Sequence, residues 1–420
     1  MYLYYGDQRA LVFGGDCAEV MPHLPAESIH ALVTDPPAGI TFMGMDWDRD
    51  KGGRDKWVTW LTGVMREAYR LLKPGAHGLV WALPRTSHWT ATALEDAGFE
   101  IRDCITHLFG SGFPKGQNIG KAFDRAAGAI TNSRAAYDAP PVTPEAVRWH
   151  GWNTTLKPAA EHWWLVRKPF TGTVIANLAE HGVGALNIDA CRIGGGVPRP
   201  TNRPVDGPDR NAIYGRGLGG SEPTTTTKGR WPTNALFTHS PGCDPEGACV
   251  DGCPVAELDA QSGWSRSPGS TTRGAGGRRA GRYGPTGAQG RVTAPGDDGG
   301  ASRFFPVFRY TPKAPPSERP RAGSVFHPTV KPLALMEWLI RLITPEGGTV
   351  LDPFGGSGAT LEAALRAPGG YQAVVIEAEP AYLPLIRQRV ERATAAQTTP
   401  DAPALFDLAN NPEANNPGAA

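Results

Sequence analysis

The chain has 420 residues, of which 42 are Lys or Arg and 41 are Asp or Glu, so the formal net charge is only +1. This balance excludes a uniformly basic protein, and any nucleic-acid-binding surface must be local. There is no run of about 18 apolar residues, and the first ten residues lack a basic segment followed by an apolar one, which argues against a membrane anchor and secretion. The six cysteines, three of them between positions 243 and 253, favour a reduced cytoplasm. The length predicts one large α/β domain with an inserted or appended module.

Residues 10–130 alternate the patterns of strands and helices. The strand patterns cover 28–34, 78–83 and 99–109, and the helical patterns cover 57–72 and 86–97. The first helical pattern places its apolar side chains on one stripe, and Lys73-Pro74-Gly75 is expected to end it. The stripe comprises Trp57, Trp60, Leu61, Val64, Ala68, Leu71 and Leu72. Such alternation predicts a sheet that is largely parallel.

Residues from about 130 to 320 are rich in Gly, Pro, Thr and Arg, most of all in 194–230 and 262–302. The second stretch has many arginines and two acids. They are Arg266, Arg273, Arg278, Arg279, Arg282 and Arg291, against Asp297 and Asp298. Such a composition cannot order itself by burying apolar surface. Two interpretations stay open: a solvated linker, or basic loops with Arg278 and Arg279 that become ordered on a phosphate backbone.

The α/β pattern returns in residues 324–393. A helix is expected to end at 338–343, strands to cover 349–352 and 371–377, and helices to cover 359–366 and 381–392. After residue 394 the chain is polar and rich in Pro and Asn, which predicts a disordered tail.

A glycine-rich turn follows the strand pattern at 349–352. In VLDPFGGSGAT, residues 350–360, Gly356 and Gly358 allow a tight turn and a close approach of the backbone to a ligand. The next strand pattern ends in Glu377, where an acid can accept hydrogen bonds from both hydroxyls of a ribose. Because no Lys followed by Ser or Thr comes after the glycines, a phosphate-binding loop is disfavoured. The pattern predicts a pocket for a nucleoside without a pyrophosphate.

Three motifs together resemble a known enzyme family. Asp-Pro-Pro at 35–37 follows a strand pattern, Asp-Pro-Phe-Gly-Gly-Ser-Gly at 352–358 precedes a helix, and HPTVKPLALMEWLI covers 327–340. These motifs resemble the DNA amino-methyltransferases that use S-adenosylmethionine. Their order, with the catalytic motif before the glycines, is that of the β class, and the Gly-Asp-Cys at 15–17 is also typical of it. FGSGFPKGQNIGKAFD, residues 109–124, resembles a segment common in members carried by phages and mobile elements.

The resemblance implies a Rossmann-like methyltransferase fold, with a mixed, mostly parallel seven-stranded sheet and helices on both faces. It assigns 1–130 to the catalytic half, 131–320 to an irregular target-recognition insert, 321–393 to the cofactor-binding half and 394–420 to the tail. The implied cofactor is S-adenosylmethionine and the implied substrate is double-stranded DNA, whose target base is flipped out of the helix. A homodimer and a cognate restriction system are further candidate partners. The expected location is the bacterial cytoplasm, at the nucleoid, with a bacterial or phage gene.

The resemblance also implies roles for individual residues. The cofactor would be lined by Asp352, Phe354, Gly356 and Gly358, with Glu377 at its ribose, Asp16 near its adenine, and Thr329 and Lys331 by its methionine end. The catalytic cleft would be formed by Asp35, Pro36 and Pro37, followed by Ala38, and DNA would contact Phe113, Lys115, Arg278 and Arg279.

The Asp-Pro-Pro motif suits the chemistry of an exocyclic amine. The lone pair of that amine is delocalised into the base, so an acceptor that bonds its N–H groups and favours tetrahedral geometry restores its nucleophilicity. The Asp35 carboxylate and the Pro36 carbonyl are such acceptors, and the two prolines hold them rigidly. Asp, rather than Ser, before the prolines favours adenine N6, with cytosine N4 as the alternative.

Ala38 departs from the family pattern, which has Tyr or Phe after the two prolines. That ring stacks on the flipped base, a contact worth about 1–3 kcal/mol. Three explanations compete: another ring, from Phe42, Trp47 or Phe113, takes this role; the position was mutated to inactivate the protein; or the protein binds DNA without catalysis. The intact residues around Ala38 favour the first. A methyltransferase for RNA or a small molecule is a further alternative.

A cluster of sulfur and imidazole ligands lies within the recognition insert. His239, Cys243, Cys249 and Cys253 occur within 15 residues that also contain Pro and Gly turns. This spacing predicts a structural zinc site with four protein ligands, against the alternative of free cysteines in a loop. A catalytic metal is not expected, because methyl transfer from a sulfonium requires none.

Overall fold

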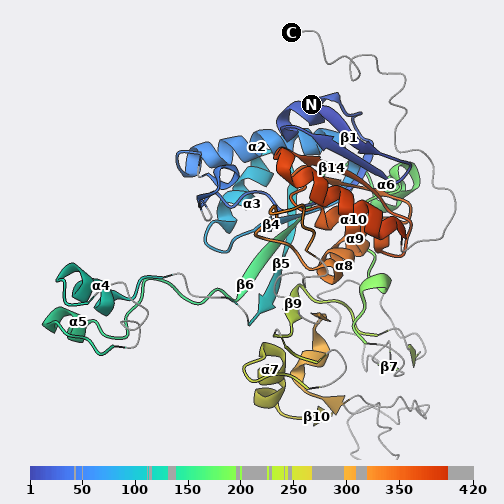
Figure 1. Ribbon diagram of the computed structural model, residues 1–420. Helices are drawn as coiled ribbons and strands as arrows, with labels where there is room; N and C mark the ends of the chain where they lie inside the picture. The colour runs from blue at the N-terminus through green and yellow to red at the C-terminus, as the bar shows by residue number, and fades with distance from the viewer. Residues whose placement is uncertain are drawn as a thin grey trace, which may run out of the picture.

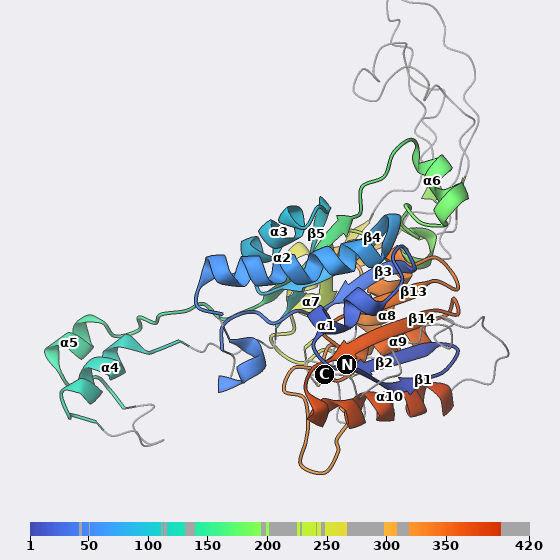
Figure 2. The ribbon, with the colours of Figure 1, turned by 90° about the horizontal axis from the view of Figure 1, so that it is seen from above.

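A computed structural model describes residues 1–41, 44–49, 51–110, 112, 116–130, 139–194, 199–200, 225–226, 229–240, 242–244, 248–266, 298–308 and 319–395. A large twisted sheet with helices on both faces forms its body (Figures 1 and 2). The order of the strands across this sheet is β1-β2-β14-β13-β3-β4-β6-β5-β9-β12.

The strands of the large sheet come from both ends and the middle of the chain. They are β1 (Tyr2–Gly6), β2 (Ala10–Gly14), β3 (Ile29–Thr34), β4 (Leu72–Ala82), β5 (Glu100–Phe109), β6 (Ala160–Arg167), β9 (Ala235–Thr238), β12 (Val307–Phe308), β13 (Thr349–Asp352) and β14 (Gln372–Glu377). All neighbours in the sheet are parallel except β1 with β2 and β6 with β4 and β5. The predicted α/β class with a mixed, mostly parallel sheet is therefore confirmed.

Two groups of helices cover the two faces of the sheet. The α-helices in the described part of the chain, including those outside these two groups, are α1 (Cys17–Val20), α2 (Arg54–Leu71), α3 (Ser87–Asp96), α4 (Ile119–Ala126), α5 (Pro144–Arg148), α6 (Val174–His181), α7 (Pro254–Ser262), α8 (Leu333–Ile343), α9 (Ala359–Arg366) and α10 (Leu383–Ala395). Helices α1, α2 and α3 pack on one face and α8, α9 and α10 on the other (Figure 2). Successive residues of a strand point to opposite faces, so in β3 Ala31 and Val33 join the α8 side while Leu32 joins the α2 side. Both faces are buried, as a largely parallel sheet requires.

The sheet has ten strands within the described residues, where the family resemblance implied seven. The additional strands lie at the edges. At one edge β1 folds back antiparallel on β2, and at the other β9 and β12, both from the predicted insert, add in parallel beside β5. Each of these segments is short, so its strand character depends on an edge partner that the local pattern does not reveal.

Strand β6 lies inside the range that was predicted to form the recognition insert. It nevertheless pairs with both β4 and β5, in the interior of the sheet. The 131–320 range is therefore not one separate module, because residues 160–167 are part of the large sheet.

Most of the elements predicted in the two α/β zones are confirmed, with shifted ends. The largest shift is at the end of α2, where Lys73, Pro74 and Gly75 belong to β4 rather than to a turn. Gly75 has a positive φ of 80°, and its N–H donates to the Lys168 carbonyl at 3.0 Å. The helix thus passes into the strand without an intervening loop.

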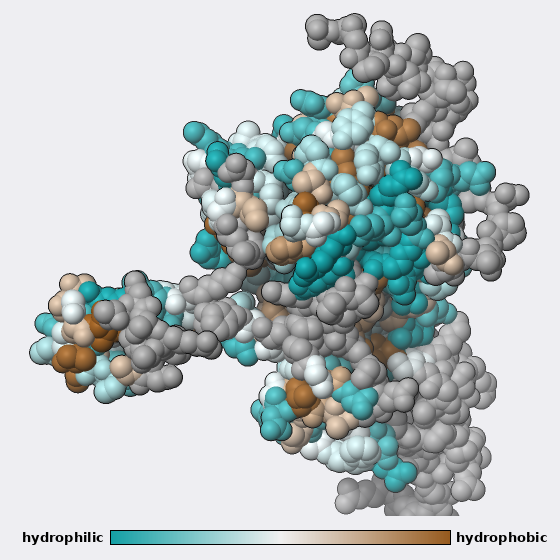
Figure 3. Space-filling view, in the orientation of Figure 1, coloured by the Kyte–Doolittle hydropathy of each residue, from teal (hydrophilic) through white to brown (hydrophobic). Residues whose placement is uncertain are grey.

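Helices α4 and α5 form an arm that projects from the body between β5 and β6 (Figures 1 and 2). Several apolar side chains on the arm face solvent, as the brown patches in Figure 3 show. Val142, Val147 and Trp152 are exposed there. Two short two-stranded pairs complete the described elements: β7 (Arg199–Pro200) with β8 (Thr225–Thr226), and β10 (Ser265–Arg266) with β11 (Asp298–Gly299). Among the described helices, none has the length and apolar character that crossing a membrane requires.

Candidate functional site

The carboxyl ends of four neighbouring strands meet at one edge of the sheet. Strands β2, β14, β13 and β3 are mutually parallel, so Gly14, Glu377, Asp352 and Thr34 all lie at this edge. Ligands bind at this position in open α/β sheets. The predicted catalytic and cofactor-binding segments are therefore brought together, although they are separated by about 300 residues of sequence.

Glu377 closes the glycine-rich turn that follows β13. Its two carboxylate oxygens accept hydrogen bonds from the backbone N–H groups of Gly356, at 2.5 Å, and Glu379, at 2.7 Å. The side chain is buried, and this burial raises the pKa of Glu377 to about 7, although the two hydrogen bonds oppose the shift. A buried carboxylate beside a backbone turn is suited to accept hydrogen bonds from the hydroxyls of a sugar.

The two glycines of the turn are needed for its shape. Gly356 has φ of 52°, and a Cβ there would lie 3.2 Å from His327 Nε2. Gly358 has φ of 80°, and a Cβ there would lie 3.2 Å from the backbone of Ile386. Any side chain at either position would therefore strain the backbone and crowd His327 or Ile386.

Asp352 begins the same turn and is almost fully buried. Thr34 Oγ1 donates to Asp352 Oδ1 at 2.7 Å, and the Phe354 N–H donates to the same oxygen at 3.1 Å. Burial raises the pKa of Asp352 to about 6, against these hydrogen bonds. Asp352 thus ties the glycine turn to the end of β3, directly before Asp35.

Asp16 lies at the same edge, beside Glu377. Gly14 pairs with Glu377 between β2 and β14, and the Gly15 N–H donates to the Glu377 carbonyl at 3.0 Å. Asp16 then caps α1, accepting from the Ala18 N–H at 2.9 Å. The exposed Asp16 carboxylate is therefore two residues beyond the strand position that pairs with Glu377.

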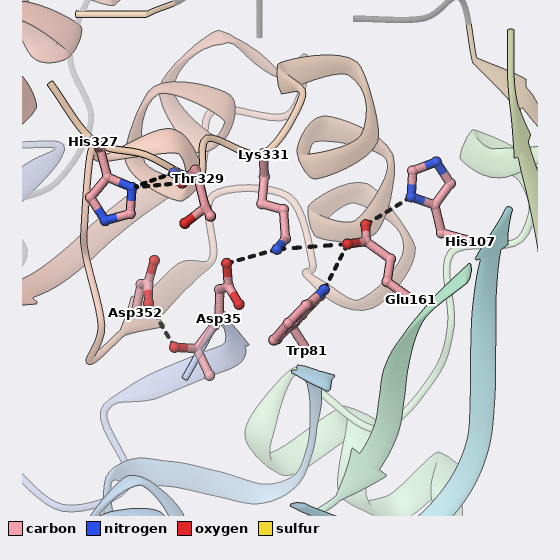
Figure 4. A network of polar contacts seen from close by, with 9 residues as sticks. Asp35, Trp81, His107, Glu161, His327, Thr329, Lys331 and Asp352 are labelled. Atoms are coloured by element: carbon pink, nitrogen blue, oxygen red, sulfur yellow. Dashed lines mark hydrogen bonds and ion pairs between the residues drawn. The ribbon is translucent and has the colours of Figure 1, made fainter. Parts of the chain in front are cut away.

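Lys331 is held between two carboxylates (Figure 4). Its Nζ lies 2.8 Å from Asp35 Oδ2 and 3.7 Å from Glu161 Oε2. The same ammonium lies 4.0 Å from the centre of the Trp81 ring, which supplies a cation–π contact. Lys331, predicted to lie by the methionine end of a cofactor, is thus in direct contact with the predicted catalytic carboxylate.

Glu161 was not identified from the sequence, and neither were its partners. Trp81 Nε1 donates to Glu161 Oε2 at 2.8 Å, and His107 Nδ1 lies 2.8 Å from Glu161 Oε1. The other ring nitrogen of His107 bonds the Thr238 hydroxyl on β9. The one local signal was an acid at the start of an apolar strand, and its significance depends on β6 running antiparallel to β4.

The charges of this cluster stabilise one another. Burial would raise the pKa of Glu161, but Lys331 and the bonds from His107 and Trp81 lower it to about 2. Burial would lower the pKa of Lys331, but Asp35 and Glu161 outweigh burial and raise it. For Asp35, burial raises the pKa and Lys331 opposes that effect. Glu161 and Lys331 are therefore both ionised at neutral pH.

The loop after Asp35 is fixed by a buried acid. Asp48 Oδ1 accepts from the Gly39 N–H at 2.9 Å, and the Thr86 hydroxyl donates to the Ala38 carbonyl at 3.4 Å. Pro36 is buried, whereas Pro37 and Ala38 are half-buried. Ala38 has only a methyl group at the position where the family pattern has Tyr or Phe.

Trp47 is one of the three rings that could stack on the target base in place of the aromatic residue missing at position 38. It stacks on His327 at 5.8 Å between ring centres, and His327 in turn contacts Tyr382 edge-on at 4.7 Å. The His327 Nδ1 lies 2.6 Å from the Thr329 carbonyl, which fixes this part of the HPTVKP segment (Figure 4). These contacts place Trp47 toward the glycine turn. The other two rings, Phe42 and Phe113, lie outside the described residues, as do the predicted DNA contacts Lys115, Arg278 and Arg279.

A second cluster lies where β9 ends and α7 begins. One ligand atom from each of His239, Cys243, Cys249 and Cys253 lies within 4.8 Å of all the others. His239 Nδ1 is 3.3 Å from Cys249 Sγ and 3.5 Å from Cys253 Sγ. The four predicted metal ligands are thus brought together, in an arrangement compatible with tetrahedral coordination by soft and borderline ligands.

Comparison with known proteins relates the chain to DNA methylases. The family model for DNA methylases of the N6/N4 type matches residues 208–388. The type II methyltransferase M.HindIII of Haemophilus influenzae is 25% identical over 214 residues, covering 42% of this chain and 64% of M.HindIII. The matched part of the chain therefore resembles DNA methylases of the N6/N4 type. The type II methyltransferase M2.DpnII of Streptococcus pneumoniae is 46% identical over 65 residues, covering 16% of this chain and 24% of M2.DpnII.

The chain spans less than two thirds of the length of these curated relatives. Among solved structures, the cytosine-N4-specific PvuII DNA methyltransferase is 14% identical, with a TM-score of 0.43, and the match covers 94% of this chain and 93% of that chain. The M1.HpyAVI complex with SAM is also 14% identical, with a TM-score of 0.39, covering 91% of this chain and 98% of that chain.

Proposed function

We propose that this protein transfers a methyl group from S-adenosylmethionine to an exocyclic amine of a DNA base. The observation that carries the proposal is the meeting of the Asp35-Pro-Pro segment with the Asp352–Gly358 turn at one edge of the sheet, where Thr34 bonds Asp352 at 2.7 Å. The similarity of residues 208–388 to DNA methylases supports the same reaction.

The residues of the glycine turn fit this cofactor. A nucleoside needs an acceptor for its ribose hydroxyls and a backbone that it can approach closely. Glu377 offers the buried carboxylate, and Gly356 and Gly358 add no side chain of their own to the turn. Asp16, at the neighbouring strand end, would lie by the adenine. When bound, S-adenosylmethionine supplies a methyl group on a sulfonium.

The chain's own contribution to the chemistry is centred on Asp35. Its carboxylate and the Pro36 carbonyl accept the N–H groups of the target amine and hold its nitrogen in line for transfer. Methylation leaves the nitrogen with a positive charge, which the negative charge of the site favours. The nitrogen then releases a proton to solvent and becomes neutral. Asp before the two prolines favours adenine N6 as the target, with cytosine N4 as the alternative.

The remaining partners belong to the same proposal. Double-stranded DNA is the substrate, and residues of 131–320 outside β6 recognise its sequence, with Phe113, Lys115, Arg278 and Arg279 contacting the nucleic acid. One zinc ion held by His239, Cys243, Cys249 and Cys253 shapes that region without taking part in catalysis. A homodimer and a companion restriction enzyme are partners that this function permits.

One observation favours a second candidate. Ala38 removes the ring that would stack on a flipped base, and a protein that binds DNA without methylating it would have that property. The purified protein should therefore be incubated with S-adenosylmethionine and DNA of diverse sequence, and the digested nucleosides analysed by mass spectrometry. N6-methyladenine supports the favoured target and N4-methylcytosine the alternative. DNA binding without either product would show that the protein binds DNA and does not methylate it.

A further inference from the structure

Lys331 is shared by two carboxylates that come from different strands. Asp35 lies at the end of β3 and Glu161 at the start of β6, and their oxygens lie 2.8 Å and 3.7 Å from Lys331 Nζ. The three side chains are between 13% and 28% exposed, so water screens their charges only in part. An ammonium so close to the catalytic carboxylate competes with the target amine for its lone pairs.

Glu161 is held in place by a chain of hydrogen bonds that the proposed reaction does not use. Trp81 and His107 each bond one of its oxygens at 2.8 Å, and the Thr238 hydroxyl bonds the far nitrogen of His107. The ring of Trp81 also lies against Lys331. This chain fixes the Glu161 carboxylate at one place beside the ammonium, and it extends to β9, one residue before the first metal ligand, His239.

We propose that Glu161 is a positioning residue for methyl transfer: it shares Lys331 with Asp35 and thereby keeps the Asp35 carboxylate accessible to the target amine. This inference rests on the proposed function. Without Glu161, the ammonium would have Asp35 as its one carboxylate partner in the cluster. Its N–H groups would then bond the oxygens that the amine requires.

The charge of the cluster supports the same role. Two carboxylates and one ammonium carry a net charge of −1, which favours a target nitrogen that becomes positive as the methyl group arrives. A neutral side chain at position 161 would leave Asp35 and Lys331 as a neutral ion pair. The catalytic step should suffer more than the binding of DNA or cofactor, because the positive charge on the nitrogen develops during transfer.

The test compares Glu161→Gln with Glu161→Asp and with a matched control. Gln retains the size of Glu161 and can still accept from Trp81, so the fold should persist. We expect kcat to fall about 10- to 100-fold, with KM for DNA and for S-adenosylmethionine changed less than about threefold. Asp restores the charge one methylene further from Lys331 and should recover part of kcat. Glu100→Gln removes a carboxylate that pairs with Arg167 at 2.6 Å on neighbouring strands, and it should retain wild-type kcat.

A pH profile separates this role from a structural one. Glu161 raises the pKa of both Asp35 and Lys331. With Glu161→Gln, both limbs of the kcat profile should therefore move to lower pH, by up to about one unit. Lys331 faces Asp35 on β3 and Glu161 on β6, and His107 on β5 faces Glu161. Asp48 and Asp352 also interact with the charge of Asp35, and His327 with that of Lys331.

The outcomes are distinct. Wild-type kcat in Glu161→Gln, or a lowered kcat with an unchanged pH profile, would overturn the positioning role. If the wild-type protein methylates no DNA, the proposed function fails instead, and an NMR titration of the Lys331 ammonium still tests the contact. Its pKa should fall in Glu161→Gln, and an unchanged value would overturn the contact itself.

Discussion

Lys331 Nζ contacts Asp35 Oδ2 at 2.8 Å, so the predicted catalytic half and the predicted cofactor-binding half of the chain meet through an ion pair. The contact joins the Asp-Pro-Pro loop after β3 to the HPTVKP segment before α8. Two motifs that are separated by nearly 300 residues in sequence therefore form one chemical unit.

Replacing Asp35 should abolish chemistry without unfolding the protein. Asp35→Asn removes the charge and one acceptor while retaining the shape, and we expect kcat to fall at least about 100-fold. The side chain is 28% exposed, so the melting temperature should change by no more than a few degrees. Initial rates of methyl incorporation and a thermal unfolding curve measure the two effects. Asp55→Asn, at an exposed ion pair on α2, is the matched control. Retention of most activity in Asp35→Asn would remove Asp35 from the mechanism.

Adding the ring that the family pattern contains distinguishes the explanations for Ala38. If another side chain stacks on the flipped base, Ala38→Tyr should leave activity within about threefold of wild type or lower it. If the ring is simply missing, the substitution should raise activity about 10- to 100-fold, because base stacking is worth about 1–3 kcal/mol. We expect the first result. Activity and the fluorescence of 2-aminopurine at the target position measure the two effects, and Ala38→Leu controls for added volume without a ring.

Cofactor affinity should depend on pH through Glu377. Because burial raises the pKa of this carboxyl to about 7, lowering the pH below 7 protonates it and removes an acceptor for the ribose hydroxyls. The Kd for S-adenosylmethionine should therefore rise as the pH falls from 7 toward 6, by up to about tenfold per pH unit. Calorimetry across this range measures the effect. Glu377→Gln should bind S-adenosylmethionine weakly and lose the dependence of Kd on pH. Any change in Kd near pH 6 that persists in this variant is attributed to protonation of Asp352.

The same carboxyl should affect the stability of the cofactor-free protein in the opposite direction: a lower pH weakens cofactor binding but favours the folded state. Its pKa is higher in the folded state than the usual 4.5, so the folded protein binds the proton more tightly than the unfolded chain does. The contribution of Glu377 to the free energy of unfolding should then be present at low pH and be lost as the pH rises from about 4.5 to about 7. Denaturant unfolding of wild type and Glu377→Gln at several pH values tests this. A contribution that grows with pH would contradict the raised pKa.

Metal analysis tests the cluster at His239. The protein should contain close to one zinc ion per chain, and Cys249→Ser should lower that ratio. Because the cluster lies between β9 and α7, losing the ion should impair DNA binding while leaving the Kd for S-adenosylmethionine at the glycine turn unchanged. Cys104→Ser, at a half-exposed thiol on β5, should retain full zinc content. Metal-free wild-type protein with undiminished DNA affinity would exclude the site.

The motifs that could be predicted from the sequence are those formed by residues that are close together in the chain. A strand ending in Asp-Pro-Pro, a glycine turn with positive φ at Gly356 and Gly358, and four ligands between 239 and 253 each depend on residues close together in the chain. The strands and helices of the two α/β zones were predictable for the same reason, since their periodicity reflects burial on one or both faces. Strands β1, β9 and β12 were not, because they are short and are strands through pairing at the edges of the sheet.

By itself, the sequence determined the α/β class, the two motifs at the ends of β3 and β13, and the family they resemble. The tertiary structure decided which side chains surround Asp35. Glu161 reaches Lys331 because β6 runs antiparallel between β4 and β5, which brings its first residues to the edge where the parallel strands end. His107 and Thr238 come to Glu161 through the neighbouring strands β5 and β9. Strand order and direction are set by the burial of the whole sheet, and no local pattern encodes them.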